Sequence, residues 1–403
     1  MEVTIKPGTA RGKITAPPSK SMAQRFLICA AMAEGTSRIE NIELSEDVAA
    51  AVRCLRALGA KIEISGSTAA VTGKIAPKDG ATLDCGASGA MLRFLIPAAI
   101  ASGREVTFTG APRLFERPLG VYEEICARRG IKFERGESSL LAKGCLSAGV
   151  YKIPGDVSSQ FASGLLFALP QLDGESRIEF TTPAESKGYI DMTLSALGTF
   201  GVFACRTADG ALITSGGCKF RPANVAVPGD YSGAAFFAAM NCLGSEIEIG
   251  GLDPNSLQSD MAYEEIFPQL CRGCPTVDIS DCPDLAPVLF ALAAAKNGGT
   301  FTGTRRLAYK ESSRAAAMAQ ELAKFGAALE IGENSVSVSG GGLHAPAEKL
   351  CSHGDHRIAM ALAALCTVFG GTISGAEAVR KSSPDFFDMM KDLGFSIESG
   401  DNI

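Results

Sequence analysis

The chain has 403 residues, a length that predicts two domains rather than one core. Hydrophobic residues make up 46% and charged residues 20%, as in soluble globular proteins, and the net charge of −6 argues against general binding to nucleic acids or membrane surfaces. The longest strongly apolar run, LAPVLFALAAA, is far shorter than the roughly 20 residues that span a membrane. The N-terminus shows no apolar signal segment, so we expect a cytoplasmic protein.

Cysteine and histidine patterns give no support for a metal site. The thirteen cysteines are scattered through apolar stretches, and Cys271 and Cys274 form a CxxC pair without a second pair. His353 and His356 are three residues apart, but no cysteine or carboxylate cluster completes a metal site around them. We therefore expect free, mostly buried thiols, no metal and no cofactor.

One pattern recurs six times along the chain: small or polar residues followed by an apolar helical run. Successive copies start 68, 69, 74, 54 and 71 residues apart. Each run is apolar on nearly all faces, which predicts a buried helix. The copies occupy residues 17–32, 85–100, 154–169, 228–240, 282–295 and 353–365.

A second element falls between these copies: an amphipathic helix, a glycine that can form a left-handed C-cap, and a strand. Each of the six units therefore reads strand–helix–strand–helix–strand(s), and six units predict two α/β domains of three units each. We expect the division near KFRPANVAVPG. The second elements occupy residues 51–64, 121–134, 192–203, 317–331 and 386–398, with a looser match at 267–279.

Polar side chains gather at the starts of the six apolar helices. Each start presents unpaired N–H groups and the positive end of a helix dipole, so several starts together would bind anions. Ordinary capping accounts for serine and aspartate there, but not for arginines inside apolar helices, which need partners when buried. The side chains are Lys20, Ser21, Arg25, Ser88, Arg93, Ser158, Ser159, Gln160, Asp284, His356 and Arg357.

Further basic residues lie in three other stretches. RLFERPLG contains Arg117, RRLAYKESSR contains Lys310, Glu311 and Arg314, and RKSSPDFF contains Lys381. A solvated charged face is the alternative interpretation of each stretch. The chain has no Walker loop and no GxGxxG after a strand, which argues against ATP and NAD chemistry in their usual forms.

Several motifs together resemble the 5-enolpyruvylshikimate-3-phosphate synthase family over essentially the whole chain. They are PPSKSMAQR, GDVSSQ, SKGYID, YKESSR, DHRIAMALAAL and KSSPDFF, in the family's order. The resemblance implies an inside-out α/β barrel with two domains and an active site in the cleft between them. It assigns residues 1–15 and 226–403 to the C-terminal domain and 16–225 to the N-terminal domain.

The resemblance also implies the reaction. Such enzymes transfer the enolpyruvyl group of phosphoenolpyruvate to the 5-hydroxyl of shikimate 3-phosphate and release phosphate, without metal or cofactor, as monomers. The catalytic positions would be Lys20, Asp284 as base and Glu311 as proton donor. Shikimate 3-phosphate would be bound by Lys20, Ser21, Arg25, Ser158, Ser159, Gln160, Ser186, Tyr189, Asp284 and Lys310. Phosphoenolpyruvate would be bound by Lys20, Gly89, Arg93, Arg117, Gln160, Arg314, Arg357 and Lys381.

A few positions depart from the family pattern. Ala87 and Ala90 replace a usual Asn and Thr, Phe94 replaces a common Pro or Leu, and Arg306 stands where some members have Asn. Glycine at position 89 accompanies glyphosate sensitivity in the family. The alternatives are a UDP-N-acetylglucosamine enolpyruvyltransferase, which would have Asn in place of Ser21, and a non-catalytic anion-binding homologue.

Overall fold

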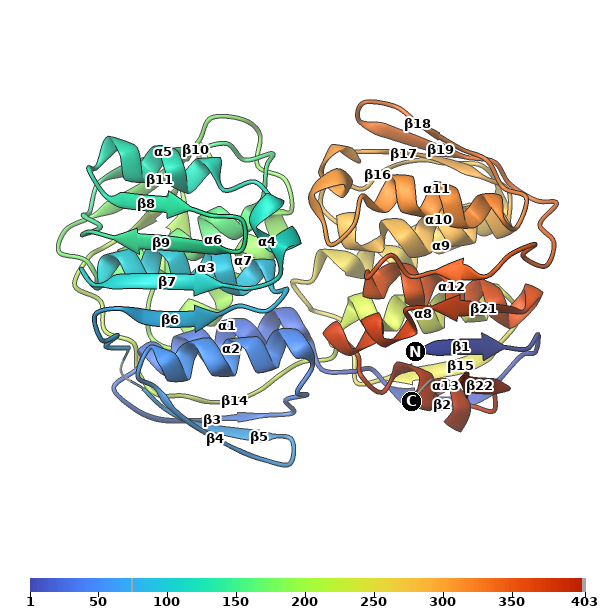
Figure 1. The fold of residues 1–403 in the computed structure, drawn as a ribbon, viewed down its shortest axis with the longest axis horizontal. Helices are drawn as coiled ribbons and strands as arrows, with labels where there is room; N and C mark the ends of the chain where they lie inside the picture. Colours follow the sequence, from blue (N-terminus) through green and yellow to red (C-terminus); the bar gives the residue numbers. More distant parts are fainter. Residues whose placement is uncertain (74, 401–403) are drawn as a thin grey trace. The chain divides into compact units, whose positions relative to one another are not determined.

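The computed structural model describes residues 1–73 and 75–400, which divide into two compact units (Figure 1). We call residues 20–228 the central unit, and residues 1–19 together with 229–403 the split unit. These boundaries lie a few residues beyond those expected from the sequence. Each unit has its own apolar core, because the buried side chains form one cluster in each.

The central unit is built around three helices whose side chains are buried almost throughout. α3 packs on α6, and α1 packs on the amphipathic helices α2 and α7. Small residues allow the close contact of α3 and α6, since a Cβ on Gly164 would lie 2.4 Å from the Arg93 carbonyl oxygen. The helices are α1 (Lys20–Met32), α2 (Glu46–Ala57), α3 (Gly89–Ala101), α4 (Pro112–Glu116), α5 (Gly120–Arg128), α6 (Ser159–Ala168), η1 (Leu169–Gln171) and α7 (Lys187–Thr199).

Three four-stranded sheets complete the central unit, with strand orders β14-β3-β5-β4, β6-β7-β9-β8 and β10-β11-β13-β12. In each sheet the first two strands are parallel and the others are added antiparallel, so one strand pattern is repeated three times. The strands are β3 (Gly35–Glu40), β4 (Lys61–Ser65), β5 (Thr68–Gly73), β6 (Ala81–Asp84), β7 (Glu105–Thr109), β8 (Lys132–Arg135), β9 (Ser139–Lys143), β10 (Val150–Ile153), β11 (Ser176–Phe180), β12 (Ala204–Arg206), β13 (Leu212–Thr214) and β14 (Asn224–Ala226).

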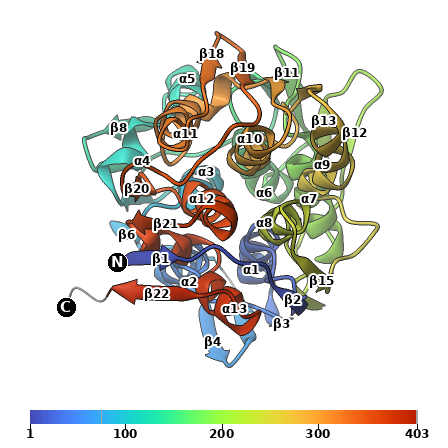
Figure 2. The same cartoon turned by 90° about the vertical axis from the view of Figure 1, so that its right-hand side faces the viewer.

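The split unit repeats this organisation. Figure 2 shows α8, α10 and α12 together at its centre, and these three helices contact one another. The helices are α8 (Tyr231–Cys242), η2 (Ser259–Ala262), α9 (Tyr263–Arg272), η3 (Pro283–Leu285), α10 (Ala286–Ala295), η4 (Arg305–Tyr309), α11 (Arg314–Ala323), α12 (His356–Phe369), η5 (Ala376–Lys381) and α13 (Phe386–Asp392).

The sheets of the split unit explain the uneven spacing of the repeat. The sheets β16-β17-β19-β18 and β20-β21-β1-β22 have the pattern described above, and in the second sheet the N-terminal strand β1 lies between β21 and β22. β15 pairs only with β2, and α9 leads directly to β16 without a hairpin, which accounts for the short spacing of 54 residues. The strands are β1 (Glu2–Ile5), β2 (Arg11–Thr15), β15 (Glu246–Gly250), β16 (Thr276–Asp278), β17 (Gly299–Thr302), β18 (Leu329–Ile331), β19 (Ser335–Val338), β20 (Leu350–Cys351), β21 (Gly371–Ser374) and β22 (Ile397–Gly400).

The predicted glycine caps follow the amphipathic helices. Gly59 after α2 and Gly326 after α11 have φ of +102° and +93°, which an L side chain rarely adopts. Gly273, in the looser match, is instead extended, with φ of −172°. No helix in the described part of the chain is long and apolar enough to cross a membrane.

Candidate active site

The split unit brings together most of its charged residues that the sequence predicted to belong to the site. We call Asp284, Lys310, Glu311, Arg314, Asp355, Arg357 and Lys381 the acid–base cluster. Asp284 lies in η3, directly before α10, and three cations contact its carboxylate. Arg314 Nη1 and Lys310 Nζ lie 2.7 and 3.1 Å from Oδ1, and Arg357 Nη2 lies 3.0 Å from Oδ2. The sequence therefore folds Asp284 into a site where its negative charge is compensated from three sides.

Arg314 links the carboxylates of the acid–base cluster. Its side chain is 1% exposed, and besides Asp284 it donates from Nε to Asp355 and from Nη2 to Glu311, both at 2.9 Å. Asp355 also caps α12 by accepting from the backbone N–H of Arg357. The planar guanidinium thus fixes Asp284 and Glu311 at its two ends.

Burial and neighbouring charges shift the pKa values of two groups in the cluster, Asp284 and Lys310. Burial alone would raise the pKa of Asp284, but Arg357, Lys310 and Arg314 outweigh burial and hold that pKa well below its usual value. Burial lowers the pKa of Lys310 to about 8, against the opposing attraction of Asp284. Asp284 is therefore ionised at neutral pH, whereas Lys310 loses its proton only slightly above neutral pH.

Glu311 and Lys381 complete the acid–base cluster. Lys381 Nζ lies 3.9 Å from Glu311 Oε1, so Glu311 contacts one arginine and one lysine. Arg306, noted as a departure in the sequence, is buried in η4 and donates to the carbonyl of Ser280. Its charge helps to lower the pKa of Lys310. A further cation therefore stands beside Lys310 in this chain.

The central unit holds the other predicted residues. Because we expect four of its cations to bind anions, we call Lys20, Arg25, Arg93 and Arg117 the anion cluster. Lys20, the first residue of α1, lies 2.9 Å from Asp47 on α2. Gln24 donates to the Asp47 carbonyl and to Ser88, joining the starts of α1, α2 and α3. Asp47 therefore belongs to the site, although the sequence presents it as an ordinary acidic residue in a helix's first turn.

Arg25 is buried inside α1 and is held by neutral oxygens. Nε donates to Thr193 Oγ1 at 2.9 Å, Nη1 to the Ser21 carbonyl at 2.8 Å and Nη2 to the Tyr189 carbonyl at 2.9 Å. Burial lowers the pKa of Arg25 to about 10, well above neutrality. The guanidinium is therefore a buried cation, and its hydrogen bonds bring the Ser21 and Tyr189 carbonyls beside it.

Arg93 and Arg117 meet at Gly89. Arg93 donates to Gln160 Oε1 and to the Pro118 carbonyl, both at 2.9 Å. A Cβ on Gly89 would lie 2.4 Å from Arg117 Nη1 and 3.1 Å from Arg93 Nη1. Glycine is thus required for both guanidinium groups to approach the start of α3.

The predicted serines lie at the starts of α6 and α7. Ser158 caps α6 by accepting from the Gln160 N–H at 3.3 Å, and Ser88 caps α3, so the ordinary capping role applies to both. Ser186, immediately before α7, is 2% exposed and has a left-handed φ of +54°. That conformation costs energy for a serine and often occurs at functional positions.

Besides Asp47, the structure adds a second buried carboxylate that the sequence did not single out. Asp260 in η2 accepts from Ser232, and its Oδ1 has no hydrogen-bond partner among the described residues. Burial raises its pKa to about 6, although the charge of Arg357 opposes this. Asp260 lies in no sequence motif, so only the fold shows that it is buried near the charge of Arg357.

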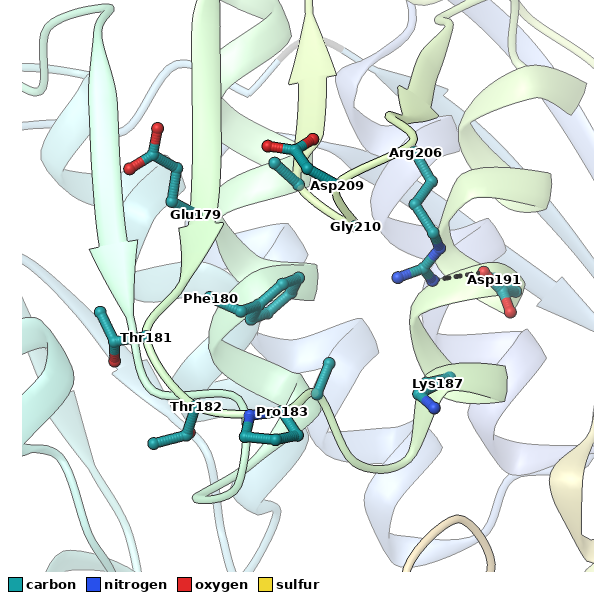
Figure 3. A pocket seen from close by; sticks show the side chains of 12 residues that line it. Glu179, Phe180, Thr181, Thr182, Pro183, Lys187, Asp191, Arg206, Asp209 and Gly210 are labelled. Atoms are coloured by element: carbon teal, nitrogen blue, oxygen red, sulfur yellow. Dashed lines mark hydrogen bonds and ion pairs between the residues drawn. The ribbon is translucent and has the colours of Figure 1, made fainter.

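A separate pocket of about 910 Å³ lies in the central unit between β11, the start of α7 and the β12–β13 hairpin (Figure 3). None of the predicted site residues lines it. Its charged residues are of both signs, and Arg206 pairs with Asp191 at 2.8 Å. The pocket therefore offers no excess of positive charge for an anion.

Comparison with known proteins identifies the family of the chain. The family model described as EPSP synthase (3-phosphoshikimate 1-carboxyvinyltransferase) matches residues 5–274 and 264–390. The chain belongs to the EPSP synthase family. It is 41% identical to a 3-phosphoshikimate 1-carboxyvinyltransferase of Clostridium kluyveri, over 98% of both chains. A protein of the same name from Clostridium botulinum strain Eklund 17B is 39% identical, over 97% of this chain and 96% of its own length.

A solved EPSP synthase from Acinetobacter baumannii shares the fold. The TM-score is 0.80 at 25% identity, and the match covers 99% of this chain and all of that one. These matches confirm the family that the sequence motifs predicted. They also confirm an α/β fold of the EPSP synthase type.

Proposed function

We propose that the chain transfers the enolpyruvyl group of phosphoenolpyruvate to the 5-hydroxyl of shikimate 3-phosphate and releases phosphate. The observation that carries this proposal is the position of Asp284 and Glu311 on one guanidinium, that of Arg314, at 2.7 and 2.9 Å. A transfer by addition and elimination needs a base for the hydroxyl and a proton donor for the methylene carbon. The acid–base cluster supplies one carboxylate for each task.

Asp284 acts on the acceptor hydroxyl. Because three cations keep its pKa low, it is ionised and accepts a hydrogen bond from the 5-hydroxyl. Lys310, with a pKa near 8 and 3.1 Å from Asp284, is mostly protonated at neutral pH, so its ammonium group orients Asp284 and binds shikimate 3-phosphate. Together they orient and activate the nucleophile.

Glu311 acts on the donor. It protonates the methylene carbon of phosphoenolpyruvate, which makes the central carbon electrophilic, and the hydroxyl oxygen adds to that carbon to give a tetrahedral intermediate. The carbon–oxygen bond to phosphate then breaks, and one proton of the methyl group formed in the first step returns to Glu311. Arg314 and Lys381 hold this carboxylate in place and compensate its charge when the proton has left.

The anion cluster binds the anionic groups of both substrates. Lys20, Arg93 and Arg117, with Arg314, Arg357 and Lys381 of the split unit, serve phosphoenolpyruvate. Arg25 and Tyr189, with Ser21, Ser158, Ser159, Gln160 and Ser186, serve shikimate 3-phosphate. Arginine and lysine supply the positive charge that transferring phosphate groups require, and hydroxyls supply additional donors.

We further propose that both clusters serve one reaction, in a monomeric cytoplasmic enzyme with the family's inside-out barrel architecture. The repeated strand order in each unit supports the barrel assignment. A UDP-N-acetylglucosamine enolpyruvyltransferase is not favoured by the family matches, and Ser21 stands where that enzyme would have Asn.

The proposal is tested by steady-state phosphate release from the purified chain. Phosphate should be released only when shikimate 3-phosphate and phosphoenolpyruvate are both present. UDP-N-acetylglucosamine should not replace shikimate 3-phosphate. Release with the nucleotide sugar, or no release beside an active control enzyme, would overturn the proposed function.

A further inference from the structure

The Arg25 guanidinium is held by hydrogen bonds that use only some of its donors. Three of its five N–H donors are used by the neutral oxygens of Thr193, Ser21 and Tyr189. Within the described residues no carboxylate forms an ion pair with Arg25, so its positive charge is not compensated there. Two N–H donors are left for an anion, provided that the guanidinium plane keeps its orientation.

Two aromatic rings contact this guanidinium. Arg25 Cζ lies 5.1 Å from the ring centroid of Phe94 and 5.9 Å from that of Tyr189. Both distances are within the roughly 6 Å at which a ring face attracts a cation. The three residues come from α1, α3 and α7, so the orientation of Arg25 depends on side chains of two other helices.

Phe94 is itself fixed. Its side chain is buried, and Phe167 on α6 packs against it edge-on, with ring centroids 5.4 Å apart and planes inclined by 63°. Phe94 also follows Arg93, so one turn of α3 contributes a cation to the site and a ring face to the cation on α1. Neither a leucine nor a proline could offer Arg25 that face.

We propose that Phe94 is a positioning residue for shikimate 3-phosphate: its ring face holds the Arg25 guanidinium so that its two remaining N–H donors meet the anionic substrate. This inference rests on the proposed function for the identity of the substrate. Phe94 touches neither substrate, and it acts through Arg25. Its effect should therefore appear mainly in the affinity for shikimate 3-phosphate.

The test compares two variants that remove the same volume from the core. Phe94→Leu should raise both KM and the calorimetric Kd for shikimate 3-phosphate by about 10- to 30-fold, the range for losing a desolvated cation–π contact. KM for phosphoenolpyruvate should change less than about 3-fold. Phe167→Leu is the matched control, because Phe167 packs on Phe94 without being one of the rings over Arg25. It should leave the Kd within about 3-fold.

A second series separates the ring's electrostatics from its shape. Incorporating mono-, di- and trifluorinated phenylalanine at position 94 weakens the negative ring face stepwise while nearly keeping its size. The logarithm of Kd for shikimate 3-phosphate should rise stepwise with fluorine number. A Kd independent of fluorination, or an equal loss in Phe167→Leu, would overturn the role of Phe94, and this series decides the matter even if Phe94→Leu does not fold.

The two proposals fail in different ways. If the wild-type chain binds shikimate 3-phosphate but releases no phosphate, and fluorination at position 94 weakens that binding stepwise, the proposed function is contradicted and the role of Phe94 is supported. Wild-type chain that turns over normally while fluorination has no effect supports the function and contradicts the role of Phe94. Wild-type chain that binds no shikimate 3-phosphate contradicts both.

Discussion

Substituting Gly89 by alanine should weaken the use of phosphoenolpyruvate through one displaced guanidinium. The new Cβ would lie 2.4 Å from Nη1 and 2.8 Å from Cζ of Arg117, whereas ordinary contacts begin near 3.4 Å. The Arg117 side chain is flexible enough to move, and it must retreat by about 1 Å. Arg93 Nη1, at 3.1 Å from the Cβ, must move by a few tenths of an ångström.

The expected magnitude follows from this displacement. A misplacement of about 1 Å at a group that positions a substrate can reduce turnover by up to 10²-fold. We therefore expect kcat/KM for phosphoenolpyruvate to fall by about 10- to 100-fold in Gly89→Ala, and glyphosate inhibition to weaken with it. KM for shikimate 3-phosphate should change less than about 3-fold, since Arg25 does not contact Gly89.

The assay is phosphate release with one substrate varied and the other saturating, for Gly89→Ala and for the control Gly120→Ala. Gly120 is also the first residue of a helix, α5, but the nearest atom to its Cβ would be 4.0 Å away. The control should therefore behave as wild type. An unchanged KM for phosphoenolpyruvate in Gly89→Ala, with the fold intact, would refute the steric argument.

Three further predictions concern charge. Since the pKa of Lys310 is about 8 in the free chain, kcat/KM for shikimate 3-phosphate should decline as the pH rises above 8. In Lys310→Arg the decline should move to higher pH, and a decline at the same pH would assign it to another group. Lys20→Met and Glu311→Gln should each lower kcat by about 10² to 10⁴-fold with the melting temperature kept within a few degrees; near-normal rates would contradict the assigned roles. Asp260 has a pKa of about 6 when folded and about 4 when unfolded, so the folded chain binds the extra proton between these values. The unfolding free energy should therefore fall as the pH rises from 4 to 6, by about 3 kcal/mol at most, and Asp260→Asn should lack this component in denaturant titrations. The same decline in the variant would show that Asp260 does not cause it.

The repeated units could be predicted from the sequence because each buried helix is apolar on nearly all faces. The capping glycines, such as Gly59, marked the ends of the amphipathic helices in the same way. The family resemblance grouped residues 1–15 with the C-terminal part of the chain, but the pairing of β1 with β21 and β22 could not be predicted, because strand pairing between the two ends of the chain leaves no local pattern.

The predicted cations of the site were found by motif, but several of their partners were not. Asp47 pairs with Lys20 although it resembles any acidic residue in the first turn of a helix. Asp355 begins the DHRIAMALAAL motif, yet its ion pair with Arg314 spans 41 residues of sequence. The contact of Phe94 with Arg25 joins two helices that each read as uniformly apolar. Such pairings depend on tertiary packing, which periodicity does not encode.

The most direct test of the addition–elimination account is to run the reaction in D₂O and to examine the product and the remaining phosphoenolpyruvate by mass spectrometry. Protonation of the methylene carbon and its reversal predict deuterium in the methylene group of the product. They also predict that Glu311→Gln loses deuterium incorporation and phosphate release together. Release of phosphate at the wild-type rate with no deuterium in the methylene group would contradict the account.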